Sequence, residues 1–136
     1  MNNCHLSIGF QASTVHLKNI HNSCIVLAPV SSSILIRNCS SVTLVAAAHQ
    51  IRVHDSRELK LHIAVRSAIV IEDCDEFQIA PYRVKDVQLD WIDTNNNWRR
   101  VQDFNWLSDE PNPHWCLMSE SEWCTFDLRT CQACSQ

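Results

Sequence analysis

The sequence of 136 residues predicts an all-β fold, a parallel β-helix closed by a tryptophan-rich C-terminal cap, and two regularities support that prediction. Between Val15 and Ile79, pairs of apolar residues recur every 17 to 19 residues, and an Asn or Asp recurs at one fixed place in each period. A repeat of this length is typical of stacked units, each packing on its neighbours. An antiparallel sandwich would instead show hairpin turns such as Asn-Gly or Asp-Gly, and the sequence contains neither.

Each repeat contains two stretches in which apolar side chains alternate with outward ones, as in a half-buried strand. The first stretches carry the pairs Val15/Leu17, Ile34/Ile36, Ile51/Val53 and Ile69/Ile71, and the second carry Ile25/Leu27, Val42/Leu44, Leu59/Leu61 and Phe77/Ile79. A weaker third stretch, such as Ala46 to Ala48 or Ile63 to Val65, completes the turn, so we predict three short strands per coil. Stacking should produce two inward ladders: Ile36, Val53 and Ile71, and Leu44, Leu61 and Ile79.

Polar residues that accept unusual backbone angles mark the corners of the predicted coils. These residues occupy one position of the repeat: Asn19, Asn38, Asp55 and Asp73. Asn and Asp tolerate the left-handed backbone conformation that a turn without glycine needs. The small residues Cys39, Ser56 and Cys74 follow directly, which suits a tight corner between coils stacked about 4.8 Å apart.

The period ends after Tyr82, and the five tryptophans of the chain follow it: Trp91, Trp98, Trp106, Trp115 and Trp123. We expect their rings to cover the open end of the β-helix, where strand edges and core would otherwise meet water. The sequence therefore predicts one domain over residues 1–123, with coils in 15–82 and a cap in 83–123. Residues 124–136 show no pattern and are predicted to form a disordered tail.

Composition excludes several classes of protein. A hydrophobic content of 46% and a net charge of −4 are typical of a globular domain and give no basic excess for binding nucleic acid. The N-terminus resembles no signal sequence, and apolar runs such as Leu44 to Ala48 are far too short to cross a bilayer. We therefore expect a cytoplasmic protein without a membrane segment. The single glycine argues against glycine-rich phosphate loops.

The eight cysteines are expected to be reduced thiols, several of them buried as small hydrophobic residues. Cys131 and Cys134 form one close pair, and Cys116 and Cys124 lie apart from it, whereas a zinc ribbon needs two close pairs. We therefore predict no metal site. The histidines at outward strand positions are predicted to be ordinary surface residues: His16, His54 and His62.

Arg52 is the strongest candidate for a functional residue. If Ile51 and Val53 point into the core, the period of two places Arg52 outward on a regular surface. The same alternation places Leu35 and Val70 beside it on the neighbouring coils. An arginine between exposed apolar side chains indicates a binding surface.

The chain resembles the cofactor C-like domain of the tubulin-folding cofactor C family in five pieces that occur in order. Those pieces are Ala28-Pro29-Val30 with Ile34 to Cys39, then His49 to His54, Val70 to Cys74, Phe77 to Tyr82, and the cap segments Asn96-Asn97-Trp98, Asp103 to Leu107 and Pro113-His114-Trp115. The resemblance implies a right-handed parallel β-helix. His49 stands where the family motif has its first glutamine.

The resemblance implies that Arg52 is an arginine finger, which a GTPase-activating protein supplies to the active site of a partner. A planar guanidinium there stabilises the negative charge that develops on the γ-phosphate. Gln50 belongs to the same motif, and Glu72 is expected to pair with Arg52 and orient it. Leu35, His49, His54 and Val70 complete the expected binding surface. No cofactor is expected, because GTP and magnesium belong to the partner.

The resemblance implies that the partner is β-tubulin in αβ-tubulin, together with the tubulin-folding cofactors D and E. It also implies that the chain is a monomer and that it is cytoplasmic and associated with the cytoskeleton. One alternative is an activator of ADP-ribosylation-factor-like small GTPases, as in the related retinitis pigmentosa protein. Another is a catalytically silent scaffold resembling the actin-binding domain of cyclase-associated protein. The sequence motifs of the cap favour tubulin over the small GTPases as the partner. Arg52 argues against the silent scaffold.

Overall fold

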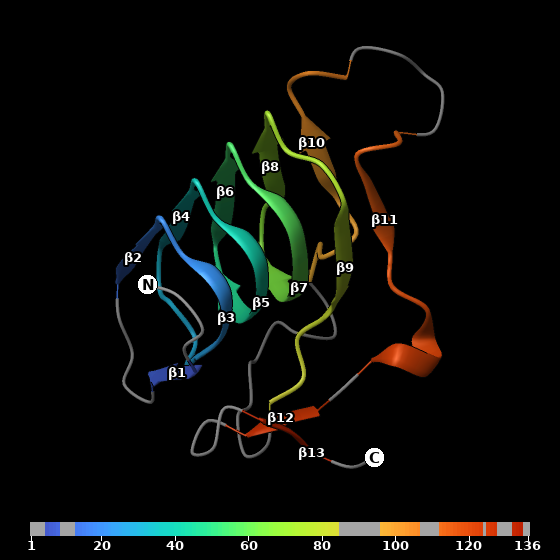
Figure 1. Cartoon of the computed structure of the whole chain (residues 1–136). Coiled ribbons are helices and arrows are strands. Elements are labelled where there is room, and N and C mark those ends of the chain that lie inside the picture. The colour runs from blue at the N-terminus through green and yellow to red at the C-terminus, as the bar shows by residue number, and fades with distance from the viewer. Residues whose placement is uncertain are drawn as a thin grey trace.

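The computed structural model describes residues 5–8, 13–84, 96–106, 112–123, 125–127 and 132–134. Thirteen strands and one short 3-10 helix make up this part of the chain (Figure 1). They are β1 (His5–Ile8), β2 (Thr14–Lys18), β3 (His21–Leu27), β4 (Ser33–Arg37), β5 (Ser40–Ala48), β6 (Gln50–His54), β7 (Arg57–Val65), β8 (Ile69–Glu72), β9 (Phe77–Pro81), β10 (Val101–Asp103), β11 (Trp115–Leu117), η1 (Glu120–Glu122), β12 (Thr125–Asp127) and β13 (Gln132–Cys134). Within these residues no helix is long and apolar enough to cross a membrane.

Two parallel sheets form the walls of a β-helix. Sheet A has the strand order β1-β3-β5-β7-β9-β11, and sheet B has the order β10-β8-β6-β4-β2. Consecutive strands alternate between the sheets from β2 to β9, so that each coil contributes one strand to each wall (Figure 1). The predicted all-β parallel β-helix is therefore confirmed.

The core consists of the two inward ladders that the period of two predicts. Ile36 lies opposite Val53 and Val53 opposite Ile71 in sheet B, while Leu44, Leu61 and Ile79 are in register in sheet A. All six side chains are buried and belong to one apolar cluster between the sheets. Burial of these stacked side chains is the main force that holds neighbouring coils together.

The corners between the sheets have the left-handed backbone that the sequence predicts. Asn19, Asn38, Asp55 and Asp73 have φ angles of 57°, 55°, 52° and 56°. Three residues further on, a second set of left-handed residues appears that the sequence analysis did not predict: Asn22, Ser41, Glu58 and Glu76. Each coil therefore changes direction at two residues with a left-handed backbone. Hydrogen bonds between side chains join second-set residues of neighbouring coils: the Ser41 hydroxyl donates to Glu58 Oε2 at 2.8 Å.

The small residues after the first corner position are buried and bond to the backbone. The Cys74 thiol donates to the carbonyl of Glu72 at 3.2 Å, and the Ser56 hydroxyl donates in the same way to His54 at 2.9 Å. Burial raises the pKa of Cys74 to about 11 and also raises the pKa of Cys39. These two free thiols are therefore protonated structural groups, as predicted.

The third strand of each coil is not a separate element. Ala46 to Ala48 and Ile63 to Val65 form the C-terminal parts of the nine-residue strands β5 and β7. Five consecutive residues at the end of each of these strands are buried, Leu44 to Ala48 and Leu61 to Val65, because the core covers one face and further side chains cover the other. The prediction of three strands per coil is thus corrected to two, the second being long.

The cap extends both sheets by one more strand. β10 pairs with β8, and β11 pairs with β9, in the same parallel sense as the coils (Figure 1). Trp98 and Trp115 pack against the end of the main core, as expected for rings that cover it. Trp91 lies outside the described residues.

A second apolar cluster lies on the outer face of sheet A. Tyr82, Val84 and Phe126 pack there on Val26, Val45, Ala47 and Ala64. Phe126 belongs to β12, which pairs with β13 in an antiparallel sense within residues 124–136, where the sequence predicts a disordered tail. His62 is also covered, with only 3% of its surface exposed and the Phe126 ring 4.8 Å away, so its prediction as a surface residue is wrong.

Candidate functional site

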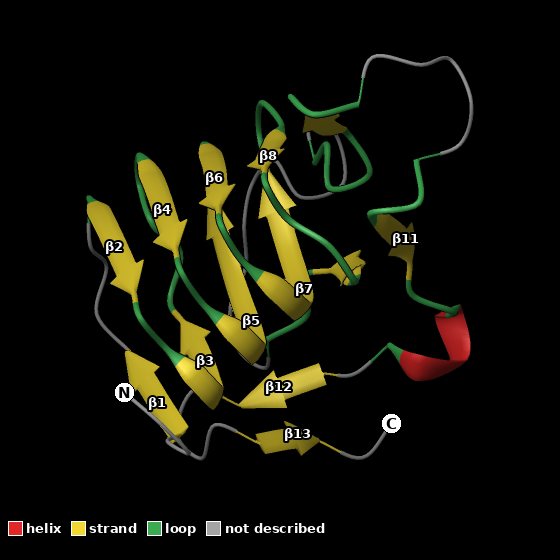
Figure 2. Cartoon of the chain, turned by 45° about the horizontal axis from the view of Figure 1, so that its top comes forward, coloured by secondary structure: helices red, strands yellow, loops and turns green. Residues whose placement is uncertain are grey.

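The outward face of sheet B carries the candidate site in regular rows. Strand register places His16, Leu35, Arg52, Val70 and Gln102 side by side in one row. The next row along the strands contains Lys18, Arg37, His54 and Glu72. Figure 2 shows β2, β4, β6 and β8, which present these rows, lying next to one another. The β-helix thus holds the two rows on a rigid surface with a repeat of about 4.8 Å.

Arg52 is exposed at the centre of its row, as the alternation of β6 predicts. Ile51 and Val53 on either side of it are fully buried, which fixes the backbone from which the guanidinium projects. Arg52 forms no ion pair with any residue in the described part of the chain. Its guanidinium is therefore available to a partner.

The two apolar neighbours of Arg52 differ in exposure. Leu35 is half-buried, whereas Val70 has only 4% of its surface exposed. The prediction that Val70 is an exposed contact residue is wrong, because β10 joins sheet B beyond it and places Gln102 in register on its far side. The apolar contact beside Arg52 is thus restricted to Leu35.

Glu72 does not pair with Arg52. It lies opposite His54 in the ladder, and its Oε2 is 3.8 Å from His54 Nδ1. Strand register brings Val70 beside Arg52 and carries Glu72 two residues further along, so His54 is the nearer neighbour. The expected ion pair between Glu72 and Arg52 is therefore not formed among the residues that the structure describes.

Gln50 and His49 lie at the start of β6. Gln50 is half-buried in the row that also contains Thr14 and Ser33, and His49 is exposed at the turn that leads into the strand. Backbone bonds from His49 and Gln50 to the carbonyl of Ser32, at 2.9 and 3.3 Å, hold this turn. Gln50 therefore lies on the same face as Arg52, one row away from it, and His49 lies in the turn just before that row.

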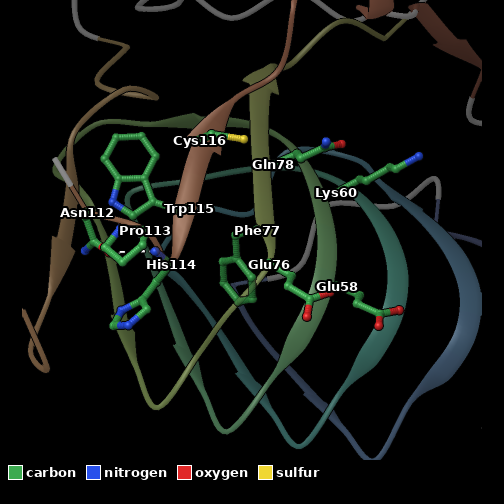
Figure 3. A pocket seen from close by; sticks show the side chains of 10 residues that line it. All are labelled: Glu58, Lys60, Glu76, Phe77, Gln78, Asn112, Pro113, His114, Trp115 and Cys116. Atoms are coloured by element: carbon green, nitrogen blue, oxygen red, sulfur yellow. Dashed lines mark hydrogen bonds between the residues drawn. The ribbon is translucent and has the colours of Figure 1, made fainter.

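Sheet A carries a groove with a cavity volume of about 500 Å³ on its outer face (Figure 3). Its lining includes Glu58, Lys60, Glu76, His114 and Cys116. A thiol and an imidazole on one groove would suggest nucleophilic chemistry, but Figure 3 shows Cys116 near Gln78 and His114 at the other end. The described residues contain no group of three or more potential metal ligands.

The imidazole of His114 belongs to a hydrogen-bonded network inside the cap. Its Nδ1 lies 2.6 Å from Oδ2 of Asp103, to which Asn112 also donates at 2.9 Å, and the Asn105 backbone donates to Oδ1 at 2.9 Å. Burial of the Asp103 carboxylate acts to raise its pKa, but these hydrogen bonds outweigh burial and hold the pKa below its ordinary value. Asn105 also accepts a hydrogen bond from the backbone of Asp73 at 2.5 Å. The network joins β10, β11 and the last corner, which is a structural role.

Comparison with known proteins identifies the family. The family model described as tubulin binding cofactor C matches residues 1–104, which include both sheets of the coils and the Arg52 face. The chain belongs to the tubulin binding cofactor C family. Tubulin-specific chaperone C of Pongo abelii is 33% identical to it over 130 residues, and tubulin-folding cofactor C of Arabidopsis thaliana is 31% identical over 129 residues.

These relatives are longer proteins. The alignments cover 90% of this chain but 38% of the Pongo abelii protein and 37% of the Arabidopsis thaliana protein. A solved structure, tubulin binding cofactor C from Leishmania major, superposes with a TM-score of 0.80 at 20% identity and covers 90% of this chain and 87% of that one. This likeness confirms the fold of the family in the present chain.

Two residues of the Arg52 face were not singled out from the sequence. Lys18 and Arg37 are exposed and lie in the row next to Arg52. A signal was present, because Lys18, Arg37 and His54 each directly precede the Asn or Asp of a corner and so occupy one position of the repeat. The roles of Asp103 and His114 depend instead on contacts across the cap, which no local pattern discloses.

Proposed function

We propose that this domain is a GTPase-activating tubulin-folding cofactor, in which Arg52 enters the nucleotide site of β-tubulin and stimulates GTP hydrolysis so that native αβ-tubulin is released. Cofactors D and E complete the complex, the domain acts as a monomer in the cytoplasm, and the reaction takes place in the partner's active site. The observation that supports this proposal is the exposed Arg52 guanidinium on a rigid strand, without an ion pair in the described structure. Membership of the family supports tubulin as the partner.

Arginine suits this task for physical reasons. In the reaction, water attacks the γ-phosphorus, the bond to the bridging oxygen breaks, and GDP and phosphate leave. Negative charge spreads over the oxygens in the transition state, and a guanidinium can meet two of them at once with parallel N–H donors. The guanidinium acts through its charge and its N–H donors, and it transfers no proton in this step. Such a residue is worth about 10³ to 10⁵ in rate in other GTPase systems.

The neighbours of Arg52 have supporting roles in this proposal. Gln50 and His49 contact the partner beside the finger, and Leu35 supplies an apolar contact in the same row. Glu72 acts on His54, its partner in the structure, so its effect on Arg52 is indirect. In this proposal the rigid strand β6 is the main element that positions the Arg52 side chain. Because the strand is already ordered, less conformational entropy is lost when Arg52 docks.

The test is single-turnover GTP hydrolysis by tubulin in complex with cofactors D and E. Arg52→Ala is expected to lower stimulation by about 10³-fold or more while leaving the melting temperature unchanged. Arg52→Lys should also fail, because it keeps the charge but loses the planar fork. Arg57→Ala is the matched control, an exposed arginine at a corner of sheet A.

Equal stimulation by parent and Arg52→Ala would exclude the arginine-finger mechanism. Stimulation of an ADP-ribosylation-factor-like GTPase in place of tubulin would reassign the partner. Absence of stimulation by the parent domain in both assays would indicate a silent scaffold.

A further inference from the structure

Charge is distributed unevenly along the chain. Residues 1–54 contain three Lys or Arg residues and no Asp or Glu, whereas residues 55–136 contain the other eight together with all fifteen acidic residues. The second part thus has a formal charge of −7, and the chain as a whole has −4. Since the coils stack in sequence order, the early coils are positive and the later coils and cap are negative.

The positive charge gathers on one face. Lys18, Arg37 and Arg52, the only Lys and Arg residues before residue 55, all project from sheet B, on β2, β4 and β6. Each is exposed, and none forms an ion pair within the described ranges. With about 4.8 Å between strands and about 3.3 Å per residue along them, Arg37 and Arg52 have Cα atoms about 8 Å apart. The three cations therefore act on one area of a partner.

Lys18 and Arg37 lie directly opposite each other on neighbouring strands. Like charges in this arrangement destabilise a sheet, and no acidic residue of β2, β4 or β6 relieves the repulsion. The acidic Glu72 at the far end of the same row lies beside His54. A repulsive pair on an otherwise regular surface indicates that its neutralising charge comes from another molecule.

We infer that the sheet B face over β2, β4 and β6 is the docking surface for an acidic region of a folded protein partner. This inference rests on the proposed function and deepens it: the acidic region surrounds the nucleotide site that Arg52 enters. Lys18 and Arg37 bind and steer, while Arg52 acts on the transition state. Leu35, half-buried between His16 and Arg52 in its row, supplies the apolar contact at the centre of the surface.

The negative half of the domain supports a protein partner over nucleic acid. A phosphate backbone that extended past β6 would meet Asp55, Glu72 and Asp73. A compact acidic surface on a protein can instead contact the positive early coils without contacting the negative later ones. The opposite charges of residues 1–54 and 55–136 would then orient the domain as it approaches this partner. Complementary charge of this kind raises association rates by about 10 to 10³-fold and loses its effect in salt.

The experiment compares two double variants with the same change in net charge. Lys18→Glu with Arg37→Glu reverses the proposed surface, and Arg57→Glu with Lys60→Glu makes the same change on the side of sheet A. The domain is titrated into the tubulin and cofactor complex loaded with a non-hydrolysable GTP analogue, and binding is measured at low and high salt. GTPase stimulation is measured in parallel with GTP.

We expect the face variant to raise the dissociation constant about ten-fold or more at low salt, with a much smaller shift at high salt. The half-saturating concentration for GTPase stimulation should rise in parallel, and the rate at saturation should change far less. Arg57→Glu with Lys60→Glu should shift binding less than two-fold. Lys18→Gln with Arg37→Gln should give an intermediate shift, and it replaces the Glu variant if that variant does not fold.

Equal shifts for the two double variants would overturn the inference, because net charge alone would then explain them. Unchanged binding by the face variant, or tighter binding of the parent to a single-stranded oligonucleotide than to the tubulin complex, would also overturn it. These outcomes differ from failure of the proposed function, in which Arg52→Ala retains stimulation whatever the binding results show.

Discussion

The buried His62 predicts a loss of stability in mild acid. Its ring lies on the outer face of sheet A between Val45 and Ala80 in the ladder, with the Phe126 ring against it. The Nδ1 atom has no hydrogen-bond partner among the residues that the structure describes. Burial, with a smaller contribution from the positive charge of Lys60, lowers the pKa of His62 from 6.5 to about 4.

This pKa shift gives the sign and size of the effect. The unfolded chain binds a proton on this imidazole below about pH 6.5, whereas the folded chain resists protonation until about pH 4. Stability from His62 is therefore fully present above the unfolded pKa and is lost as the pH falls toward the folded one. At about 1.4 kcal/mol for each pKa unit, the whole loss is about 3 kcal/mol, and about 2 kcal/mol of it falls between pH 7 and pH 5.

Urea unfolding at pH 7 and pH 5 measures this loss, and His62→Leu isolates it from other histidines. The leucine variant keeps an apolar side chain under Phe126 and cannot be protonated, so its free energy of unfolding should fall by about 2 kcal/mol less than that of the parent over the same interval. His16→Gln, a change at an exposed histidine, should behave like the parent. If parent and His62→Leu lose equal stability, the folded protein already accommodates the proton and the reasoning fails.

Three further substitutions test other parts of the structure. Val53→Ala removes a fully buried side chain from the sheet B ladder and should lower the free energy of unfolding by about 1 to 3 kcal/mol in urea, with Arg57→Ala as an exposed comparison. Asn38→Ala places alanine at a φ of 55° and should cost about 1 kcal/mol, whereas Asn38→Gly should be tolerated; equal losses would refute the role of backbone angle. Asp103→Asn disrupts the cap network and should speed amide exchange in β10 and β11 while leaving β4 and β6 protected, and unchanged exchange would show that the network is dispensable.

The sequence by itself determined the repeating part of the fold. A strand places alternate side chains on opposite faces, so the recurring pairs ending in Ile36, Val53 and Ile71 could stack in only one register without exposing the core. Asn38 and Asp55 marked the corners because few other residues accept a left-handed backbone cheaply. The outward position of Arg52 followed from the same alternation.

The tertiary structure decided which outward side chains meet solvent and which partners they choose. Val70 is covered because β10 joins sheet B, and His62 is covered because Phe126 arrives from β12, and neither strand belongs to the repeat. Glu72 lies beside His54 because strand register pairs those two residues, while Arg52 lies opposite Val70. The two-residue period of a strand fixes the face on which a side chain lies. Whether that side chain is buried, and which residue it pairs with, depends on segments distant in sequence, and no local pattern encodes how those segments pack.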